Sequence, residues 1–328
     1  MEVSDLFDVP LVDLGTVDAS YRGILTPAPE IDRDKEGVTD QFLADARTYH
    51  ERYSNAAHFK NLFAQVFASC GKPDTAAPLI LDIGTGSGIN TVVPCLELFP
   101  GCRLVATDIS PQLLVILREF ISANDLADRV APVATDAMLN HFRPRSFDLV
   151  VGASILHHLL DPSVALAAAH RALKPGGTAI FFEPFEGFGL LRAAFEAILD
   201  RAPQQLPVLP ERLDRVLRAF IRDFEMRSGS DKSNPLLRYM DDKWLFTRSY
   251  VAAAARRTGF TATEFVPLHA PTHLFRQLAL SLFRMADPSI DAETVPAWAI
   301  KELERFDRCL SDDMKKDILF EAGIVLRA

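Results

Sequence analysis

The sequence predicts an α/β protein with a doubly wound, mostly parallel sheet of seven strands. Between residues 79 and 183, short apolar segments alternate with helix-like segments, which is typical of a parallel sheet covered on both faces. A glycine-rich turn directly follows the first of these segments, and two more apolar segments near the C-terminus can complete the sheet. We therefore expect one α/β domain that carries added helices.

The expected strands are apolar segments bounded by turn residues. They lie at 79–83, 103–107, 130–134, 147–152, 178–183, 261–266 and 318–326. Helices are expected between these strands, at 39–69, and near the C-terminus at 188–228, 247–258, 271–286 and 296–314. The chain then divides into an N-terminal segment with lid helices (1–70), a cofactor-binding core (71–187), and helical substrate-binding insertions with the last two strands (188–328).

Composition narrows the class of protein. Of the 328 residues, 48% are hydrophobic, and no apolar segment approaches the roughly 20 residues that a membrane span needs. The acidic N-terminus does not resemble a signal peptide, so we expect a cytoplasmic protein. A net charge of −9 opposes binding to nucleic acid, and the four cysteines lack the spacing of a zinc site or a disulfide framework.

The turn after the first strand carries glycines at alternate positions, Gly84, Gly86 and Gly88. Glycine lets the backbone turn sharply and approach a ligand that a Cβ atom would push away. A nicotinamide-binding turn would place its next glycine where Ile89 stands. The pattern favours another nucleoside ligand, although a glycine turn alone can simply connect a strand to a helix.

Two acids follow later strands at positions that suit a nucleoside. Asp108 ends the second strand, 20 residues after Gly88, where a carboxylate can accept hydrogen bonds from both ribose hydroxyls. Asp136 follows the third strand and can accept from an adenine amino group, while Ala137 offers a backbone N–H. Alone, Asp108 would suit a helix N-terminus. With the glycine turn, the two acids predict a nucleoside site.

Several motifs in order, LDIGTGSG, ATDIS, ATDA, FDLVVGASILHHL and RALKPGGTAIFFEP, resemble the class I S-adenosylmethionine-dependent methyltransferases, within residues 39–183. The resemblance is to the small-molecule branch of that family. It implies a Rossmann-like methyltransferase fold, lid helices over the cofactor, and S-adenosyl-L-methionine as the cofactor. The binding residues that it implies are Tyr49, Asp82, Gly84, Gly86, Gly88, Asp108, Ile109, Asp136, Ala137 and Ser154, with Asp82 anchoring the turn.

Methyl transfer needs an aligned, dry site, and a general base only where the nucleophile must lose a proton. The candidate catalytic residues follow the fourth and fifth strands: His158 first, then His157 and Glu183. The alternative is that the LHHL segment caps or packs. His269 and His273 share the spacing of a metal pair, but no third ligand is evident, so we expect no metal.

The leading hypothesis is an enzyme that methylates O, N or C of a small metabolite. The chain has 23 phenylalanines, several of them between 181 and 195, which favours an apolar or aromatic acceptor. We expect no nucleic-acid or membrane partner and allow a homodimer. The alternatives are a catalytically silent S-adenosylmethionine sensor or partner subunit, and an NAD(P)-dependent oxidoreductase.

Overall fold

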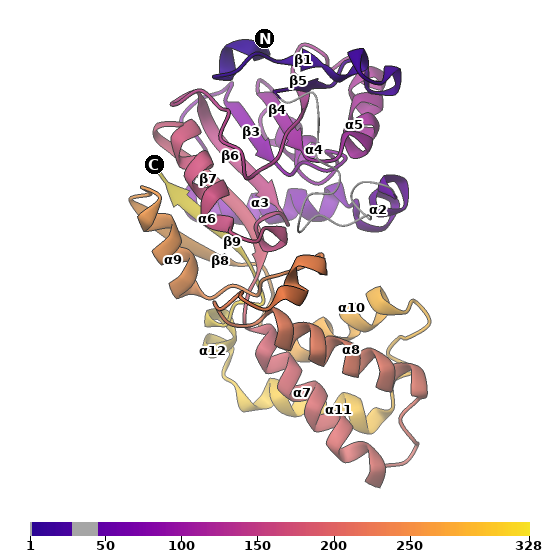
Figure 1. Cartoon of the computed structure of the whole chain (residues 1–328). Helices are drawn as coiled ribbons and strands as arrows, with labels where there is room; N and C mark the ends of the chain where they lie inside the picture. The colour runs from indigo at the N-terminus through magenta and orange to yellow at the C-terminus, as the bar shows by residue number, and fades with distance from the viewer. Residues whose placement is uncertain (1, 28–44) are drawn as a thin grey trace.

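A computed structural model describes residues 2–27 and 45–328, so Thr39 and Phe42, at the start of the first expected helix, lie outside the described residues. The main element is a single mixed sheet in the order β1-β2-β5-β4-β3-β6-β7-β9-β8 (Figure 1). Its strands are β1 (Val12–Asp13), β2 (Leu25–Thr26), β3 (Leu79–Ile83), β4 (Arg103–Asp108), β5 (Val130–Ala134), β6 (Phe147–Ala153), β7 (Leu173–Pro184), β8 (Ala262–Pro267) and β9 (Glu321–Arg327).

The predicted fold class is confirmed, with nine strands rather than seven. All seven expected strands are present, and β9 runs antiparallel to both of its neighbours. The two additional strands, β1 and β2, are two residues long and extend the β5 edge. The sequence could not reveal them, because two residues carry no periodicity; the carboxylate of Asp13, which accepts from the backbone N–H groups of Gly15 and Gly23, folds this segment.

Alternate residues of each strand point to opposite faces of the sheet, and each face has its own core. Ile80 packs with helices α3 (Ala56–Cys70), α4 (Val92–Leu98) and α5 (Pro111–Ala123). Leu81, the next residue, packs on the opposite side, where α6 (Pro162–Ala172) and α9 (Arg248–Arg257) contribute. The sheet is therefore covered on both faces, as expected.

Four helices form a separate helical lobe with its own apolar core below the sheet in Figure 1. They are α7 (Phe188–Arg201), α8 (Glu211–Arg227), α10 (Leu274–Ala286) and α11 (Ala297–Cys309). The helical segment expected over 188–228 contains two helices, because Pro203, Pro207 and Pro210 cannot continue a helix and separate α7 from α8.

Two element boundaries near the sheet also differ from expectation. Strand β7 begins at Leu173 and not at residue 178, because the KPGG segment continues the strand. The last strand begins three residues later than expected, since the hydroxyl of Ser311 caps the short helix α12 (Asp312–Asp317).

The helical lobe lies at the carboxyl edge of the sheet. The chain leaves this edge after β7 and β8, and it returns here into the antiparallel β9. The order of the parallel strands reverses between β3 and β6, where open α/β sheets bind ligands beyond the strand ends. The helical insertions therefore face the expected ligand crevice.

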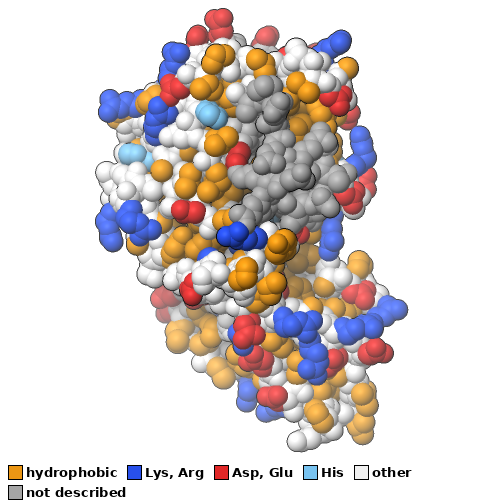
Figure 2. Space-filling view, viewed as in Figure 1, with side chains coloured by type: hydrophobic (Ala, Val, Ile, Leu, Met, Phe, Trp, Pro, Cys, Tyr) orange, Lys and Arg blue, Asp and Glu red, His pale blue; other side chains and the backbone are white. Residues whose placement is uncertain are grey.

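The surface of the helical lobe carries charges of both signs. Acidic and basic side chains are interspersed over the helical lobe on the face shown in Figure 2. Within 2–27 and 45–328, no helix combines the length and the apolar character needed to cross a membrane.

Candidate functional site

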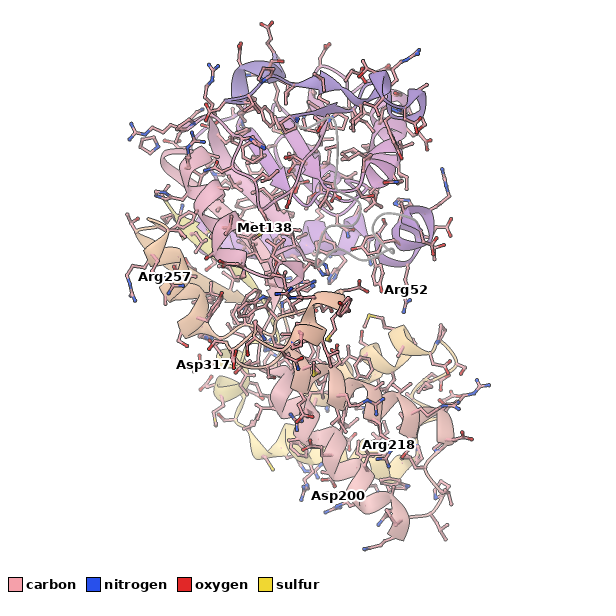
Figure 3. The ribbon with its side chains drawn as sticks, in the orientation of Figure 1. Arg52, Met138, Asp200, Arg218, Arg257 and Asp317 are labelled. Atoms are coloured by element: carbon pink, nitrogen blue, oxygen red, sulfur yellow. The ribbon has the colours of Figure 1, made fainter. Side chains whose placement is uncertain are left out.

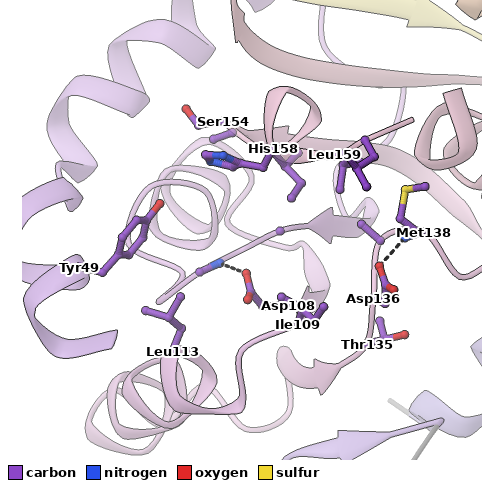
Figure 4. A pocket seen from close by; sticks show the side chains of 16 residues that line it. Tyr49, Asp108, Ile109, Leu113, Thr135, Asp136, Met138, Ser154, His158 and Leu159 are labelled. Carbon is purple, nitrogen blue, oxygen red and sulfur yellow. Dashed lines mark hydrogen bonds between the residues drawn. The ribbon is translucent and has the colours of Figure 1, made fainter. Parts of the chain in front are cut away.

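A pocket of about 1000 Å³, part of it open to solvent, lies beyond the carboxyl ends of β3 to β6 (Figure 4). We call it the cofactor pocket. Eight of the ten predicted cofactor residues line it: Tyr49, Gly84, Gly86, Asp108, Ile109, Asp136, Ala137 and Ser154. The lining also includes Ala153, which the family resemblance placed with Ser154 at the methionine end, and residues that the sequence did not single out, namely Leu113, Thr135, Met138, Ile155, Leu159 and Leu160. Most of these are apolar, and nothing in their local sequence distinguishes them from core residues.

The three glycines of the turn have different surroundings. All three alternate glycines have positive φ, and a Cβ on Gly84 would lie 2.6 Å from Ile155 Cγ1. Gly86 has no atom within 4 Å of that position, so its bare backbone faces open space in the pocket wall. A Cβ on Gly88 would meet Leu117 instead, which shows that Gly88 supports close packing and does not line the pocket.

Asp82 also lies outside the pocket lining. Its fully buried carboxylate accepts a hydrogen bond from the Thr91 hydroxyl, and its carbonyl accepts one from the Thr107 hydroxyl. Burial raises the pKa of Asp82 to about 7. Asp82 is therefore bonded to Thr91 and Thr107, and its anchoring role in the glycine turn stays a prediction.

Asp108 and Asp136 are held at the pocket wall by backbone hydrogen bonds, two of which are dashed in Figure 4. Asp108 accepts from the Gly86 N–H at 2.7 Å and the Ser110 N–H at 2.8 Å, and Asp136 accepts from the Met138 N–H at 2.8 Å. Burial raises the pKa of Asp108 to about 6. Each carboxylate oxygen has more than one lone pair, so both groups can also accept from a ligand.

One buried hydroxyl in the cofactor pocket was missed by the sequence analysis. Thr135 Oγ1 is buried and has no hydrogen-bond partner among the residues that the structure describes. An unpaired buried polar group costs free energy, so a hydrogen-bonding ligand would stabilise this position. Together with the open space at Gly86, this fits a polar, nucleoside-sized cofactor.

A smaller polar cavity adjoins the glycine turn beneath the lid helix α2 (Ala46–Tyr53). Its wall includes Ser54, Ser87 and Asn90. His50 Nδ1 lies 2.7 Å from Ser87 Oγ, and Asn90 donates to the Tyr53 carbonyl at 3.0 Å. The lid helix is thus fixed to the glycine turn, as expected for a helix that covers a cofactor.

A third and larger cavity, about 1880 Å³ including space open to solvent, lies between the sheet and the helical lobe. We call it the acceptor cleft. Phenylalanine side chains from four elements line it: Phe59 from α3, Phe182 from β7, Phe188 from α7, and Phe220 and Phe224 from α8. Arg52 extends from α2 toward the lobe (Figure 3) and donates to the Met285 carbonyl of α10 at 3.2 Å.

The acceptor cleft and the cofactor pocket meet at four residues, Tyr49, Ala153, Ser154 and His158. Ser154 has a left-handed φ of +58° and donates its N–H to the Phe182 carbonyl at 3.0 Å. Non-glycine residues in this conformation are uncommon and cluster at functional sites. The junction therefore has the geometry of a point where two bound molecules could react.

The predicted catalytic residues His157 and Glu183 form a buried ion pair beside this junction. His157 Nδ1 lies 2.6 Å from Glu183 Oε2, and its Nε2 lies 3.3 Å from Asp242 Oδ1. Burial lowers the pKa of His157, but the two carboxylates outweigh this effect and raise it to about 9. His157 is therefore a cation at neutral pH and a poor base.

His158 is in the opposite state. Burial and the neighbouring charge of His157 lower its pKa, so the ring is neutral at pH 7. Its Nδ1 lies 3.0 Å from the Asp241 carbonyl, which can only accept, so Nδ1 carries the proton and Nε2 the lone pair. Of the two histidines, His158 lines both cavities and has the protonation state of a base.

The sequence analysis missed Asp242 and Arg227, which complete this cluster. Arg227 Nη1 lies 3.1 Å from Asp242 Oδ2 and 2.9 Å from Asp223 Oδ2. Both Asp242 and Arg227 come from the segment after β7, where no motif pointed to a site. His157, His158 and Asp242 bring one ligand atom each within 4.8 Å, but His157 and Arg227 already supply the positive charge there. The absence of a metal stays a prediction.

His269 and His273 do not form a pair. His269 Nε2 lies 2.9 Å from the Lys315 carbonyl, and His273 precedes α10 in a left-handed conformation. They were considered as metal ligands only because of their spacing, which is helical, whereas the helix begins after both.

Comparison with known proteins agrees with this geometry. A family model described as a methyltransferase domain matches residues 81–179, which span the glycine turn, Asp108, Asp136 and both histidines. This segment is a class I methyltransferase domain. The predicted resemblance is thus confirmed, and S-adenosylmethionine is the cofactor of this domain, as predicted.

Relatives and solved structures resemble parts of the chain. A demethylmenaquinone methyltransferase of Thermus thermophilus is 32% identical over 131 residues, 38% of this chain and 58% of the relative. A ubiquinone/menaquinone biosynthesis C-methyltransferase of Paracoccus denitrificans is 34% identical over 104 residues, 32% of this chain and 41% of that protein. The chain therefore matches only about half the length of these relatives.

One solved structure shares the fold over most of its length. It is a chain in the complex of the Haloferax volcanii Trm112 methyltransferase activator, with a TM-score of 0.52 and 16% sequence identity. The match covers 89% of this chain and 99% of that chain. At this identity, the likeness shows a common fold.

Proposed function

We propose that this chain transfers a methyl group from S-adenosylmethionine to an oxygen, nitrogen or carbon atom of a small apolar or aromatic molecule. The observation that carries the proposal is the junction of the cofactor pocket and the acceptor cleft at Tyr49, Ala153, Ser154 and His158. Methyl transfer requires donor and acceptor atoms to meet in line in a site that excludes water. These residues form the shared wall of the two cavities, so a donor in one and an acceptor in the other would meet there.

Each part of the cofactor pocket has a proposed role. Asp108 would accept hydrogen bonds from the ribose hydroxyls, and Asp136 and Thr135 would bind at the adenine end. The polar cavity at Ser54, Ser87 and Asn90 would take the amino-acid end. When bound, S-adenosylmethionine supplies a methyl group that its sulfonium already makes electrophilic. The protein's task is then to orient the acceptor, and His158 is placed to take a proton from it.

The acceptor class follows from the lining of the cleft. Five phenylalanines face it, and leucine and methionine side chains of α10 extend the apolar surface. Aromatic rings favour flat apolar ligands through stacked and edge contacts. The two relatives named above are methyltransferases of quinone biosynthesis, which supports a quinone-like ring as one acceptor to test.

A sensor that binds S-adenosylmethionine without turnover would need the cofactor pocket but not the acceptor cleft. A nicotinamide enzyme would need a further glycine where Ile89 stands. Both alternatives are therefore less favoured than methyl transfer. A homodimer and the absence of nucleic-acid and membrane partners stay predictions.

The test is methyl transfer from S-adenosylmethionine with a trideuterated methyl group into a metabolite extract, followed by mass spectrometry. We expect labelled products with the native chain and none with Gly84→Ala, whose turn cannot accept the cofactor. Cofactor binding by calorimetry with no labelled product across the extract would favour the sensor. Binding of NAD(H) without S-adenosylmethionine would overturn the proposal.

A further inference from the structure

The loop between α8 and α9 places Asp242 on the floor of the acceptor cleft. Asp242 Oδ1 lies 3.3 Å from His157 Nε2 and 3.3 Å from His158 Nδ1, while its Oδ2 contacts Arg227. The loop is fixed there by two further hydrogen bonds: the Lys243 N–H donates to the His157 carbonyl, and Trp244 Nε1 donates to the Leu159 carbonyl, each at 2.8 Å. Asp242 is therefore positioned by its neighbours on both sides.

The partners of His157 require a proton on both ring nitrogens. Glu183 and Asp242 are carboxylates, which only accept, and each faces one nitrogen. Glu183 is held rigidly, since it also accepts the backbone N–H groups of Ile155, Leu156 and His157. The imidazole thus lies between two fixed acceptors and must be an imidazolium to satisfy both.

The positive charge of His157 disfavours protonation of the adjacent His158. The rings of His157 and His158 are 4.1 Å apart between centroids, so a second positive charge on His158 is disfavoured. The Asp241 carbonyl meanwhile keeps the proton of the neutral ring on Nδ1. Lone-pair character is therefore confined to Nε2 of His158, at the wall between the two cavities.

We propose that Asp242 is a positioning residue that keeps His157 a cation, and that the charge of His157 outweighs the direct contact of Asp242 with His158 and keeps His158 a neutral base at the junction. This inference rests on the proposed methyl transfer. It narrows the acceptor to a molecule that gives up a proton to the base as it is methylated, as an oxygen or carbon acid does. The methyl–sulfur bond breaks as the new bond to oxygen or carbon forms, and the acceptor's proton passes to Nε2 of His158, so charge is conserved.

Other charged groups around the cluster come from several elements. They are Asp223 and Arg227 on α8, Asp241 and Lys243 on the loop, and Glu321 on β9. Asp223 pairs with Arg227, and Glu321 lines the cleft. In the described residues, the carboxylates recorded within 4 Å of His157 are those of Glu183 and Asp242, and none of the five groups above is among them.

The test is nuclear magnetic resonance of the chain with ring-¹⁵N histidine, in the absence of cofactor and acceptor. His157→Gln and His158→Gln assign the signals. At pH 7.5 we expect both ring nitrogens of His157 to be protonated, and His158 to carry a proton on Nδ1 alone. In Asp242→Asn the titration midpoint of His157 should fall by about 1 pH unit or more, the size of shift that loss of an adjacent opposite charge produces.

The matched control is Asp241→Asn, which removes a carboxylate from the same loop but leaves its carbonyl facing His158. This variant should keep the His157 midpoint within about 0.5 pH unit, since surface charges beyond direct contact are largely screened. A neutral His157 in the native chain, a proton on Nε2 of His158, or equal midpoints in Asp242→Asn and the native chain would overturn the inference. Stoichiometric Zn²⁺ binding that displaces the His157 protons would also overturn it.

The two proposals fail separately. The charge states are measured without any acceptor, so their failure beside continued methyl transfer would remove the role of Asp242 alone. Once the labelled extract identifies an acceptor, kcat/KM in Asp242→Asn should lose the native pH profile while S-adenosylmethionine affinity stays the same. The expected charge states in a chain that does not bind S-adenosylmethionine would instead defeat the proposed function.

Discussion

The cofactor pocket and the acceptor cleft share a wall but are assembled differently. Apart from Tyr49, the cofactor pocket is lined by residues between Gly84 and Leu160, at the ends of four consecutive strands. The acceptor cleft draws on segments from Tyr49 to Glu321, including three helices of the lobe. Apart from Tyr49, the cofactor pocket is thus contained in a single family-matched segment, whereas the acceptor cleft exists only where distant segments pack together.

This difference teaches where each kind of specificity is encoded. Parallel βα units bring their strand ends to one edge, so neighbouring turns form a cofactor site without help from the rest of the chain. The acceptor cleft depends on how the helical lobe docks, and the lobe has its own apolar core. Changes in the two regions should therefore have separable effects.

The largest expected effect is in the lobe. Phe195 is fully buried in α7 and contacts the rings of Phe220, Phe224 and Phe283. Phe195→Ala should lower the free energy of unfolding by about 3–5 kcal/mol, because it leaves a cavity. We expect S-adenosylmethionine affinity, by calorimetry, to change little. Leu190→Ala on the same helix, 40% exposed, is the control. A large loss of cofactor affinity in Phe195→Ala would show that the two regions are not separable.

Gly84→Ala should act on the opposite region. A left-handed φ costs a non-glycine residue about 1–2 kcal/mol, and overpacking against Ile155 costs about 1–3 kcal/mol more. Thermal unfolding and calorimetry should show lower stability and loss of cofactor binding. Gly176 also has a positive φ, but no atom lies within 4 Å of the Cβ that Gly176→Ala would add. This variant should therefore lose only the stability that the left-handed φ costs. Equal losses in both variants would exclude the contact with Ile155.

The pH dependence of the free energy of unfolding should report the ionisation of His157 beside the acceptor cleft. The pKa of folded His157 is about 9, above its unfolded value, so its contribution is complete below pH 6.5 and is lost as the pH passes 9. Denaturation with urea should show the free energy of unfolding falling over this window by on the order of 3 kcal/mol. His157→Gln should flatten the curve there. A native curve that is already flat would contradict the doubly paired imidazolium.

Asp108→Ala should weaken S-adenosylmethionine binding by about 1–3 kcal/mol, because ribose hydroxyls and the Gly86 N–H lose their acceptor. Calorimetry on the folded variant measures this change. Asp161→Ala, which removes only an exposed helix cap, should bind the cofactor like the native chain. Unchanged affinity in Asp108→Ala would remove its role at the ribose.

The smallest expected effect is at the mouth of the cleft. Arg52→Ala removes the hydrogen bond to the Met285 carbonyl but, as an exposed side chain, should change stability by no more than about 0.5 kcal/mol. Hydrogen–deuterium exchange should nevertheless rise at the end of α10. Arg47→Ala on the same helix, whose side chain lies 3.9 Å from the Glu119 carboxylate, is the control. Unchanged exchange would mean that Arg52 does not connect the lid helix to the lobe.

The sequence by itself determined the sheet and most of the cofactor pocket. Strand periodicity, alternate glycines and the spacing of Asp108 and Asp136 are local signals, and the βα geometry places such residues together wherever they occur. The same signals suggested His157, His158 and Glu183, because all three follow strands that end at the crevice. They did not distinguish the neutral histidine from the cationic one, since the two histidines are adjacent and chemically identical.

Only the tertiary structure decided that distinction. Asp242 and Arg227 reach the histidines from a loop and a helix beyond the matched segment, and their contacts set each ring's charge through distances of about 3 Å. No periodicity records such a contact, because it depends on how the helical lobe packs against the sheet edge. The prolines that divide α7 from α8 can be read in the sequence. The cleft that these helices line cannot, because it forms only when the helical lobe packs against the sheet.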